Sequence, residues 1–348
     1  MSNVFIYHHN DMDGKVSGAL CFYYEKNIKN TKGNNIHLFE IDYEYVFKEN
    51  IKPQDTVYFV DYSFSKECNV DFLKELIRKD VEVVWIDHHK TSKELLNDDH
   101  ELKTLLELKT NANYVVDISY CATYLVYDYL YKEVNKDETP SYIPMLIKYV
   151  DSYDCWKHNM DDTHEFHNGF RYVNLNVSSF FSNIKTNRYN DYVDVNILLP
   201  YKYKDDPTKA FVNKCIRTGK IIKKYVDDNN EKECKFAAFE FTIEYFGREL
   251  ECIALNIHGA SQVFGDRIKK YDIVVPFIFK GTQFKYYMFT ENEDIDCSAI
   301  VKCLDVDNLG AGGHAKAAGF HTKNLILRKD CTIIIKKGLF GKPKLIFK

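Results

Sequence analysis

The sequence predicts an α/β fold in two parts: an N-terminal doubly wound parallel sheet and a smaller C-terminal α+β domain with a mixed sheet. The chain has 348 residues, more than a single compact core ordinarily holds. Its first 155 residues alternate short β-rich runs with helical patterns, which is typical of a parallel sheet covered on both faces. Beyond residue 207 the predicted strands follow one another more directly, which indicates a different, mixed architecture.

The strands of the first part are predicted from apolar runs that are rich in β-branched and aromatic residues and too short for buried helices. These runs are residues 4–8, 36–41, 56–61 and 81–87. Helical patterns lie between and after them. The predicted helices are the segment after Gly14 and residues 69–80, 118–131 and 140–152, the last with Pro140 and Pro144 near its start.

Polar, Asn-rich sequence dominates residues 156–207, and we expect the connection between the two parts late in this stretch. A long helix is predicted from about Pro207 to about residue 228. Strands are then expected near 235–243, 250–256, 272–280 and 284–290, with helices near 260–270 and 296–304. The domains predicted on this basis are 1–195, 196–322 and a basic tail over 323–348.

Composition excludes several classes of protein. Hydrophobic residues at 45% and charged residues at 28% rule out a disordered or collagen-like chain. No apolar run approaches the roughly 20 residues that span a bilayer, so we expect no membrane insertion. The ten cysteines occur singly and without CxxC pairs, which favours reduced thiols over disulfides or structural zinc. Together with a start that lacks a secretion signal, this predicts a cytoplasmic protein.

The net charge of −4 conceals an asymmetry, because residues 321–348 carry eight Lys or Arg against the single Asp330. The acidic remainder argues against binding of long duplex DNA, which needs a broad basic face. The basic tail is either a solvated segment or a contact strip for nucleic acid. Its alternation of apolar and basic residues predicts a β-hairpin around Gly338–Gly341; the alternative is a strand that binds a partner or forms a homodimer.

Acidic and histidine side chains gather where predicted strands and helices end. They are His8, His9, Asp11 and Asp13 after the first strand, Asp61 after the third, Asp87, His88 and His89 at the fourth, and Asp151 and Asp154 at a helix end. The carboxyl ends of parallel strands face one crevice, so these groups converge. Such carboxylates would repel one another without cations. Their number favours two ions, and oxygen-rich sites with some imidazole suit Mn²⁺ or Mg²⁺.

The late segment GAGGHAKAAGF (310–320) combines a glycine-rich loop with an expected helix start. Glycines let backbone N–H groups approach an anion, and a helix N-terminus favours negative charge. His314 and Lys316 add two cationic donors, which suits a phosphate or a terminal nucleotide. An ordinary turn is the alternative.

Together, HNDMDGKVSGAL (9–20), VDYS (60–63), DHH (87–89) and YVDSYDCW (149–156) resemble the ordered motifs of the DHH phosphoesterase superfamily. GAGGHAKAAGF resembles the glycine–histidine motif of its DHHA1 substrate domain. The resemblance implies a DHH catalytic, metal-binding domain followed by a DHHA1 substrate-binding domain. The family includes nanoRNases, RecJ-type single-strand exonucleases, cyclic-dinucleotide phosphodiesterases, phosphatases of nucleoside bisphosphates and pyrophosphatases.

The resemblance also implies roles for individual residues. The implied ligands of two Mn²⁺ ions, for which Mg²⁺ or Co²⁺ could substitute, are His9, Asp11, Asp13, the bridging Asp61, His88 and one aspartate of 151–154. His89 would face the scissile phosphate, and Asp87 would orient a histidine. In the segment that corresponds to residues 151–156, the family often has Asp-x-Asp-x-Trp, whereas this chain has Ser152 at the position of the first aspartate. A shift of one residue makes Asp151 the preferred ligand, with Asp154 as the second choice.

In the second domain the resemblance implies that Gly312, Gly313 and His314 grip one end of the substrate. Relatives often carry a phosphate-binding arginine in the stretch that corresponds to residues 286–296, and this chain has none there. Either Lys316 or another cation would take its place, or the phosphate of the substrate would be held less tightly. Asn256 and Ser261 occupy positions at which relatives have an Asn and a Ser, so they are further candidate contacts.

The function predicted on these grounds is a two-metal phosphoesterase that cleaves short oligonucleotides or dinucleotides, with a metal-bridged hydroxide as the nucleophile. Alternatives within enzymes are a cyclic-dinucleotide phosphodiesterase, a single-strand exonuclease, and a phosphatase or pyrophosphatase acting on small nucleotides. A non-catalytic nucleotide sensor and a structural module with an inactive site are alternatives of other classes.

Overall fold

The structure is a computed structural model that describes residues 2–64, 69–136, 138–173, 175–183, 197–198, 206–258, 261–337 and 343–348. It divides into two compact units, Met1–Ile222 and Lys223–Lys348, and the division falls within the helix α9 (Lys209–Ala237). The predicted boundary between 195 and 196, and most of the predicted connection, lie outside the described residues.

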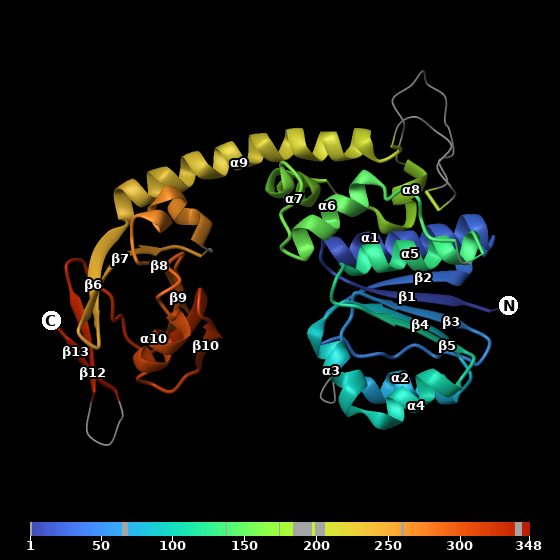
Figure 1. The fold of residues 1–348 in the computed structure, drawn as a ribbon, viewed down its shortest axis with the longest axis horizontal. Coiled ribbons are helices and arrows are strands. Elements are labelled where there is room, and N and C mark those ends of the chain that lie inside the picture. The colour runs from blue at the N-terminus through green and yellow to red at the C-terminus, as the bar shows by residue number, and fades with distance from the viewer. Residues whose placement is uncertain are drawn as a thin grey trace. The chain divides into compact units, whose positions relative to one another are not determined.

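The first unit contains a five-stranded sheet in which every pair of neighbouring strands is parallel. Its strands are β1 (Val4–His9), β2 (Ile36–Ile41), β3 (Thr56–Val60), β4 (Glu82–Asp87) and β5 (Ala112–Val116), in the spatial order β2-β1-β3-β4-β5 (Figure 1). The four strands predicted from the sequence are confirmed. Strand β5 was not predicted, because its short, partly polar sequence ANYVV has no clear alternation.

Helices cover both faces of this sheet, as a doubly wound fold requires (Figure 1). They are α1 (Met12–Tyr23), α2 (Val70–Arg78), α3 (Lys90–Asp98), α4 (His100–Leu108), α5 (Ala122–Val134), α6 (Met145–Asp154), α7 (Thr163–Tyr172) and α8 (Phe180–Asn183), with the short turns η1 (Tyr24–Ile28), η2 (Gly33–Asn35) and η3 (Val177–Ser179). Helices α1 and α5 share one core, and α2 and α4 contribute to the other.

The side chains of β3 show why the strands are apolar throughout. Tyr58 and Val60 point into the core beneath α1 and α5, whereas Val57 and Phe59 point into the core beneath α2. All four are buried. Because successive strand residues face opposite sides of a sheet, a strand buried on both faces reads as a continuous apolar run.

The strand order places a topological switch point between β1 and β3. The chain leaves β1 to form β2 on one side and then crosses to form β3 on the other. In such sheets the crevice at the carboxyl ends of the strands at the switch point is the usual ligand site. Polar residues lie at the ends of both strands here: His9 is the last residue of β1, Asp11 comes shortly after it, and Asp61 directly follows β3.

The second unit is built on an eight-stranded mixed sheet with the order β10-β11-β9-β8-β7-β6-β12-β13. Its strands are β6 (Phe239–Tyr245), β7 (Arg248–Asn256), β8 (Ile273–Lys280), β9 (Gln283–Phe289), β10 (Ala311–His314), β11 (Ala317–Thr322), β12 (Thr332–Lys337) and β13 (Pro343–Phe347). The pairs β7–β8 and β12–β6 are parallel, and the others are antiparallel. Helix α10 (Cys297–Leu304) packs on its larger core, and the short turns of η4 (Ser261–Lys269) contribute to a smaller one.

Two predictions for this unit are wrong. Residues 317–322 form β11, whereas the sequence was expected to start a helix. Ala318 and Phe320 alternate with less buried neighbours, a period of two that fits a strand. Residues 235–237 continue α9, although a strand was expected to begin there.

The basic tail joins the sheet of the second unit. Strand β12 pairs in parallel with β6, and β13 pairs antiparallel to β12 as the predicted hairpin requires. The turn expected around Gly338–Gly341 lies outside the described residues.

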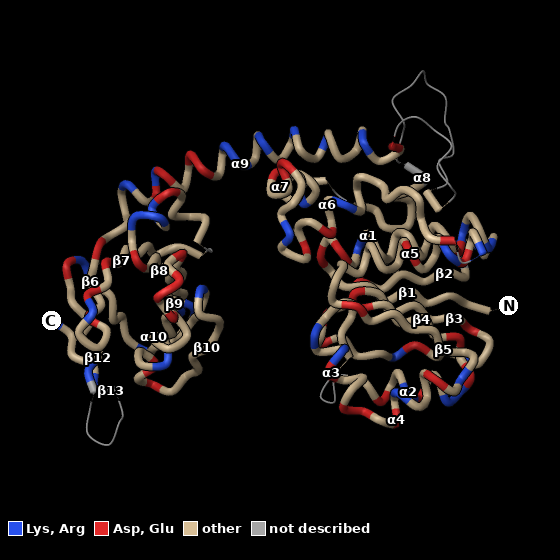
Figure 2. The backbone as a smooth tube through the Cα atoms, viewed as in Figure 1, with Lys and Arg blue, Asp and Glu red and all other residues tan. Residues whose placement is uncertain are grey.

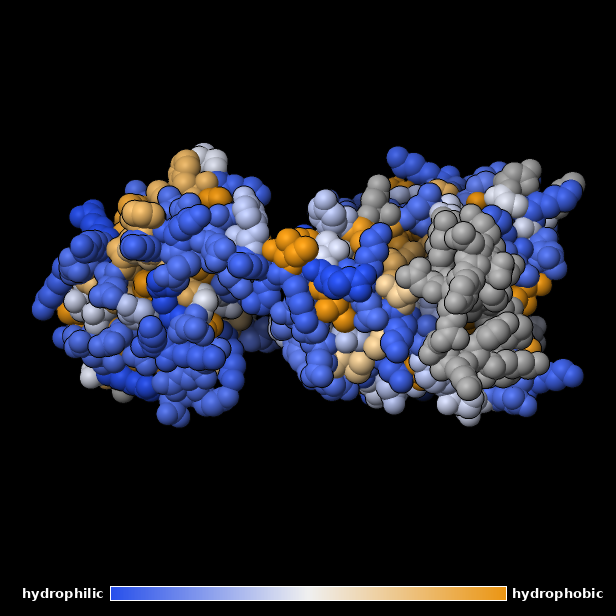
Figure 3. Space-filling view, turned by 90° about the horizontal axis from the view of Figure 1, so that it is seen from above, coloured by the Kyte–Doolittle hydropathy of each residue, from blue (hydrophilic) through white to orange (hydrophobic). Residues whose placement is uncertain are grey.

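Charges of both signs are mixed along the helices of both units (Figure 2). The face drawn in Figure 3 is mostly hydrophilic, with apolar residues in small groups. None of the described helices is both long enough and apolar enough to cross a bilayer, as expected.

Candidate metal centre

The carboxyl ends of β1, β3 and β4 and the end of α6 bring the predicted acidic and histidine side chains together. His88 Nε2 lies 3.3 Å from Asp61 Oδ1, 3.2 Å from Asp154 Oδ2 and 3.6 Å from Asp13 Oδ2. On the other side of Asp61, His9 Nδ1 lies 3.8 Å from Asp61 Oδ2 and 2.8 Å from Asp11 Oδ2. Side chains from four separate segments therefore meet around one carboxylate.

The ligand atoms form overlapping sets. His9, Asp11 and Asp61 offer one set of atoms within 4.8 Å of one another, and Asp61, His88 and His89 offer another. Asp61 belongs to both sets. A carboxylate has two oxygens that can each take a cation, so this arrangement has room for two ions that share Asp61.

A third set contains His88, Asp154 and Cys155. Burial raises the pKa of the Cys155 thiol to about 12, so at neutral pH the sulfur is protonated unless a metal displaces the proton. Sequence reasoning overlooked Cys155, and its isolated position among the cysteines gave no signal.

Asp61 is the most constrained residue of the cluster. Its backbone adopts a left-handed conformation (φ 57°), which is uncommon outside glycine, asparagine and aspartate. Its Oδ2 is buried and has no hydrogen-bond partner among the described residues. Burial and the nearby carboxylates Asp13 and Asp11 raise the pKa of Asp61 well above its usual range. A buried carboxylate oxygen with no partner is the atom that a cation would satisfy.

Helix N-termini support two of the other carboxylates. Asp11 caps α1 by accepting a 2.9 Å hydrogen bond from the Gly14 backbone N–H. Asp13, which is fully buried, accepts hydrogen bonds from the backbone N–H groups of Ala122 (2.8 Å) and Thr123 (2.7 Å) at the start of α5. These donors have no partner within their own helix, so the carboxylates satisfy them.

The surroundings of Asp11 and Asp154 shift the pKa values of these two carboxylates in opposite directions. Burial alone would raise the pKa of Asp11, but hydrogen bonds from His9 and Gly14 outweigh it and lower the pKa to about 2. Burial and repulsion from Asp13 and Asp11 raise the pKa of Asp154 to about 8. A site with no cation would therefore hold at least one proton at pH 7.

His89 is held by Asp87 at the end of β4. Its Nδ1 lies 2.7 Å from Asp87 Oδ1, and Ser92 donates a hydrogen bond to the other carboxylate oxygen. Burial alone would lower the pKa of His89, but its contact with the Asp87 carboxylate raises the pKa overall. Asp87 is completely buried and stays ionised, since the hydrogen bonds from His89 and Ser92 lower its pKa despite burial.

Asp151 and Asp154 lie one turn apart on α6 and have different surroundings. Asp151 accepts a hydrogen bond from the Cys121 backbone N–H at 2.9 Å and pairs with Lys157 at 2.7 Å. Asp154 lies beside His88. The geometry therefore does not support the preference for Asp151 over Asp154, because the Asp151 oxygens already have a helix N-terminus and a lysine as partners.

The remaining first-strand histidine lies outside the cluster. His8 is buried, and its ring packs against Gly18 of α1. Its Nδ1 lies 2.9 Å from the His9 carbonyl oxygen. This side chain is a core histidine with a satisfied nitrogen.

The candidate residues of the second unit lie on its sheet. Gly312, Gly313 and His314 form most of the edge strand β10 and are exposed. Lys316, in the turn before β11, makes an ion pair with Glu293. Asn256 ends β7, and Ser261 begins η4. The glycines are followed by strand β11 and not by a helix. The prediction that a helix N-terminus helps to bind an anion here is therefore wrong.

The donor set suits divalent cations. It contains carboxylates and imidazoles, a buried orphan oxygen on Asp61, and elevated pKa values on Asp61 and Asp154 that a cation would reverse. Oxygen-rich donors with some imidazole favour Mn²⁺ or Mg²⁺ over a tetrahedral zinc site. The residues present therefore fit a metal centre.

Comparison with known proteins finds one family model and several solved structures that are similar to this chain. Residues 3–147 match the family model described as "DHH family, N-terminal domain". No curated protein matches the chain. Among solved structures, a pGpG-specific phosphodiesterase from Vibrio cholerae is 9% identical, with 92% of this chain and 94% of that chain covered and a TM-score of 0.44.

Two further solved structures are similar. RecJ from Thermus thermophilus, in complex with Mn²⁺, is 15% identical over 91% of this chain and 49% of that chain, with a TM-score of 0.39. An uncharacterized protein from Helicobacter pylori is 16% identical over 93% and 94% of the two chains, with a TM-score of 0.35. Residues 3–147 of this chain thus form a domain that is similar to the N-terminal domain of the DHH family.

Proposed function

We propose that this protein is a metal-dependent phosphoesterase that hydrolyses phosphodiester bonds in short oligonucleotides or dinucleotides. The observation that carries the proposal is Asp61, a buried carboxylate in a left-handed conformation with an unpartnered oxygen, which two sets of ligand atoms share. Strained, unsatisfied groups of this kind persist where a ligand compensates for them.

Two divalent cations, Mn²⁺ in the first instance, would share Asp61. His9 and Asp11 would complete one site, and Asp13, His88 and Asp154 the other. Asp154 is proposed in place of Asp151 because it lies 3.2 Å from His88. When bound, such ions lower the pKa of a coordinated water and neutralise the charge of phosphate oxygens.

His89 is proposed to contact the phosphate that reacts. The buried Asp87 fixes the orientation of its ring and favours the protonated imidazole, which can donate a hydrogen bond to a phosphate oxygen. Charge that develops on that oxygen in the transition state would then be stabilised by a preorganised donor.

The second unit is proposed to bind one end of the substrate. Strand β10 is at the edge of its sheet, so the backbone groups on its outer side have no strand partner. Gly312, Gly313 and His314 would present these groups to a terminal nucleotide without a bulky side chain at the two glycines. Lys316, Asn256 and Ser261 stay candidate contacts, and Lys316 would have to leave Glu293 to serve.

The direct test is hydrolysis of the 5′-phosphorylated dinucleotide pApA with Mn²⁺, followed by chromatography of the products. Asp61→Asn and His88→Ala should each lower the rate by about 10²- to 10³-fold, because each removes a ligand of the ions that stabilise the transition state. Asparagine tolerates the left-handed backbone at position 61, so that variant should fold.

The matched control is Asp117→Asn. Asp117 also follows a strand of this sheet, but its carboxylate caps a turn by accepting from the Ser119 N–H at 2.9 Å. It should keep the wild-type rate. Wild-type rates in the Asp61 and His88 variants would contradict the proposal.

The same assay separates the alternative substrates. Rates on pApA, cyclic di-AMP, pAp and pyrophosphate distinguish an oligonucleotide hydrolase from a cyclic-dinucleotide phosphodiesterase and from a phosphatase. Tight binding of a nucleotide without turnover under any divalent cation would identify a sensor.

A further inference from the structure

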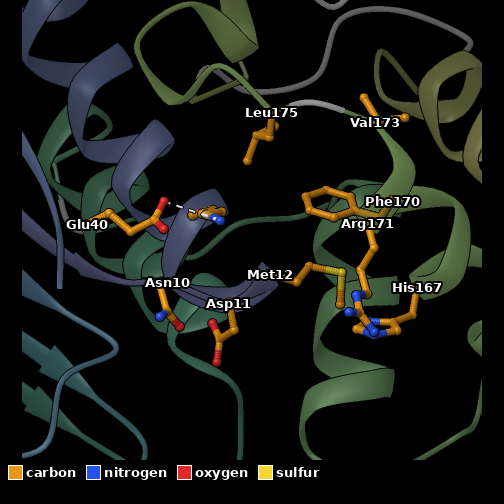
Figure 4. A pocket seen from close by; sticks show the side chains of 10 residues that line it. Asn10, Asp11, Met12, Glu40, His167, Phe170, Arg171, Val173 and Leu175 are labelled. Atoms are coloured by element: carbon orange, nitrogen blue, oxygen red, sulfur yellow. Dashed lines mark ion pairs between the residues drawn. The ribbon is translucent and has the colours of Figure 1, made fainter. Parts of the chain in front are cut away.

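A cavity of about 610 Å³ adjoins the metal cluster within the first unit (Figure 4). Residues from the start of α1, the end of β2 and the last turns of α7 line it, together with Val173 and Leu175. Asp11 belongs both to this lining and to the cluster. Its size is within the range of small-molecule sites.

Two cations reach the cavity, and only one of them has an anionic partner. Lys15 lies 3.2 Å from the carboxylate of Glu40, which lines the same cavity. Arg171, at the end of α7, has no hydrogen bond or ion pair with any residue that the structure describes. A guanidinium is the side chain best suited to grip a phosphate with two parallel hydrogen bonds.

His167, one turn before Arg171, contributes an unsatisfied polar atom. Its Nδ1 is buried and has no hydrogen-bond partner in the described part of the chain. The ring is fixed by stacking on Tyr153, with centroids 3.7 Å apart and planes 7° apart. Figure 4 shows His167 and Arg171 next to each other on the α7 side of the cavity.

Apart from the polar Asn10, the rest of the lining is apolar. Met12, Phe170, Val173 and Leu175 provide hydrocarbon and aromatic surface beside the cationic group. Figure 4 shows the Phe170 ring on the α7 side and the Met12 side chain extending from the Asp11 side toward α7. Asp11, Lys15 and Glu40 line the cavity as well. The guanidinium of Arg171, unpaired among the described residues and beside apolar walls, nevertheless matches a nucleotide, which carries a phosphate and a flat, weakly polar base.

We infer that this cavity binds the nucleotide next to the scissile bond, and that Arg171 holds the terminal phosphate of a 5′-phosphorylated dinucleotide. The inference rests on the proposed function for the position of the scissile bond. It places a phosphate-recognition site in the first unit, in addition to the glycine strand of the second. It also supplies a cation for a chain that has no arginine among residues 286–296.

The experiment compares kcat/KM for pApA with that for ApA, which lacks only the terminal phosphate. The wild type should prefer pApA. Arg171→Ala should reduce this preference by about 10- to 100-fold, the usual effect of losing a charge-assisted contact. Arg171→Lys keeps the positive charge but loses the two parallel N–H donors of the guanidinium. Its preference for pApA should therefore lie between that of the wild type and that of Arg171→Ala.

Arg217→Ala is the matched control, since Arg217 is an exposed arginine of α9 in the same unit that does not line the cavity. It should leave the preference unchanged. If His314→Ala abolishes the preference and Arg171→Ala does not, the terminal phosphate binds in the second unit and the inference is wrong. Arg171 is exposed, so its variants should fold, which thermal melting would verify.

A binding measurement separates this inference from the proposed function. Calorimetric titration with pApA in EDTA, where no turnover occurs, should show binding that Arg171→Ala weakens by a similar factor. Arg171-dependent binding in a protein that never turns over would refute the phosphoesterase and leave the inference standing. Turnover with no Arg171 dependence, or no binding at all, would overturn the inference.

Discussion

The two units differ in the burial and the partners of their polar candidate residues. In the first, Asp61 and His167 have buried polar atoms without partners, and Asp154 has a pKa of about 8. In the second, Gly312 and His314 are exposed, and Lys316 is paired with Glu293. Neither of the buried unpartnered atoms found in the described residues lies in the second unit.

The difference indicates where a ligand is needed. Buried groups without partners destabilise a protein unless something binds them, whereas exposed groups are satisfied by water. The first unit therefore has the chemistry of a site that a cation would complete. The described residues of the second unit contain no such buried group, and its proposed contribution to binding would come from accessible backbone groups.

The largest effect is expected within α6. Asp154→Asn should lower Mn²⁺-dependent hydrolysis by about 10²- to 10³-fold, because it removes a carboxylate beside His88. Asp151→Asn should cost about 1 kcal/mol of folding free energy and much less activity, since Asp151 partners Lys157 and the start of α5. Steady-state rates and urea unfolding measure the two effects. The reverse pattern would restore Asp151 as the ligand.

The next effect tests the glycine strand. Gly313 has φ 136°, and a Cβ there would lie 2.5 Å from the Ala318 Cα, so Gly313→Ala should destabilise the protein by about 2–3 kcal/mol. A Cβ on Gly312 meets no atom within 4 Å, so Gly312→Ala should fold normally. Loss of pApA affinity in Gly312→Ala would therefore report a contact with substrate. Equal melting temperatures for the two variants would show that the β10–β11 hairpin differs from the structure.

The smallest effect concerns pH. Asp154, with a raised pKa of about 8, keeps a proton that the unfolded chain has lost above its ordinary value near 4. The native state therefore binds more protons, and stability in EDTA should fall as pH rises from 6.5 to 8. A decrease of a few degrees in melting temperature is expected, smaller in Asp154→Asn, and Mn²⁺ should reverse it. A wild-type melting temperature that rises over this interval contradicts the assignment.

Much of the first sheet and part of the candidate metal centre could be predicted from the local sequence. The strands at 36–41 and 56–60 follow from apolar runs, and the approach of Asp61 to His88 follows from the rule that parallel strands share a carboxyl edge. Strand β11 could not be predicted in this way. Glycine and alanine in AAGFHT are compatible with several structures, and pairing with β9 and β10 decides among them.

By itself the sequence determined which acidic and histidine residues lie at the strand ends, because apolar periodicity and strand direction are local properties. Only the tertiary structure decided which aspartate of α6 lies beside His88, since Asp151 and Asp154 are one turn apart and differ in the partners that packing brings to them. The cavity beside Arg171 was likewise decided by tertiary structure. Its walls come from α1, β2 and α7, and no local pattern records that these segments meet.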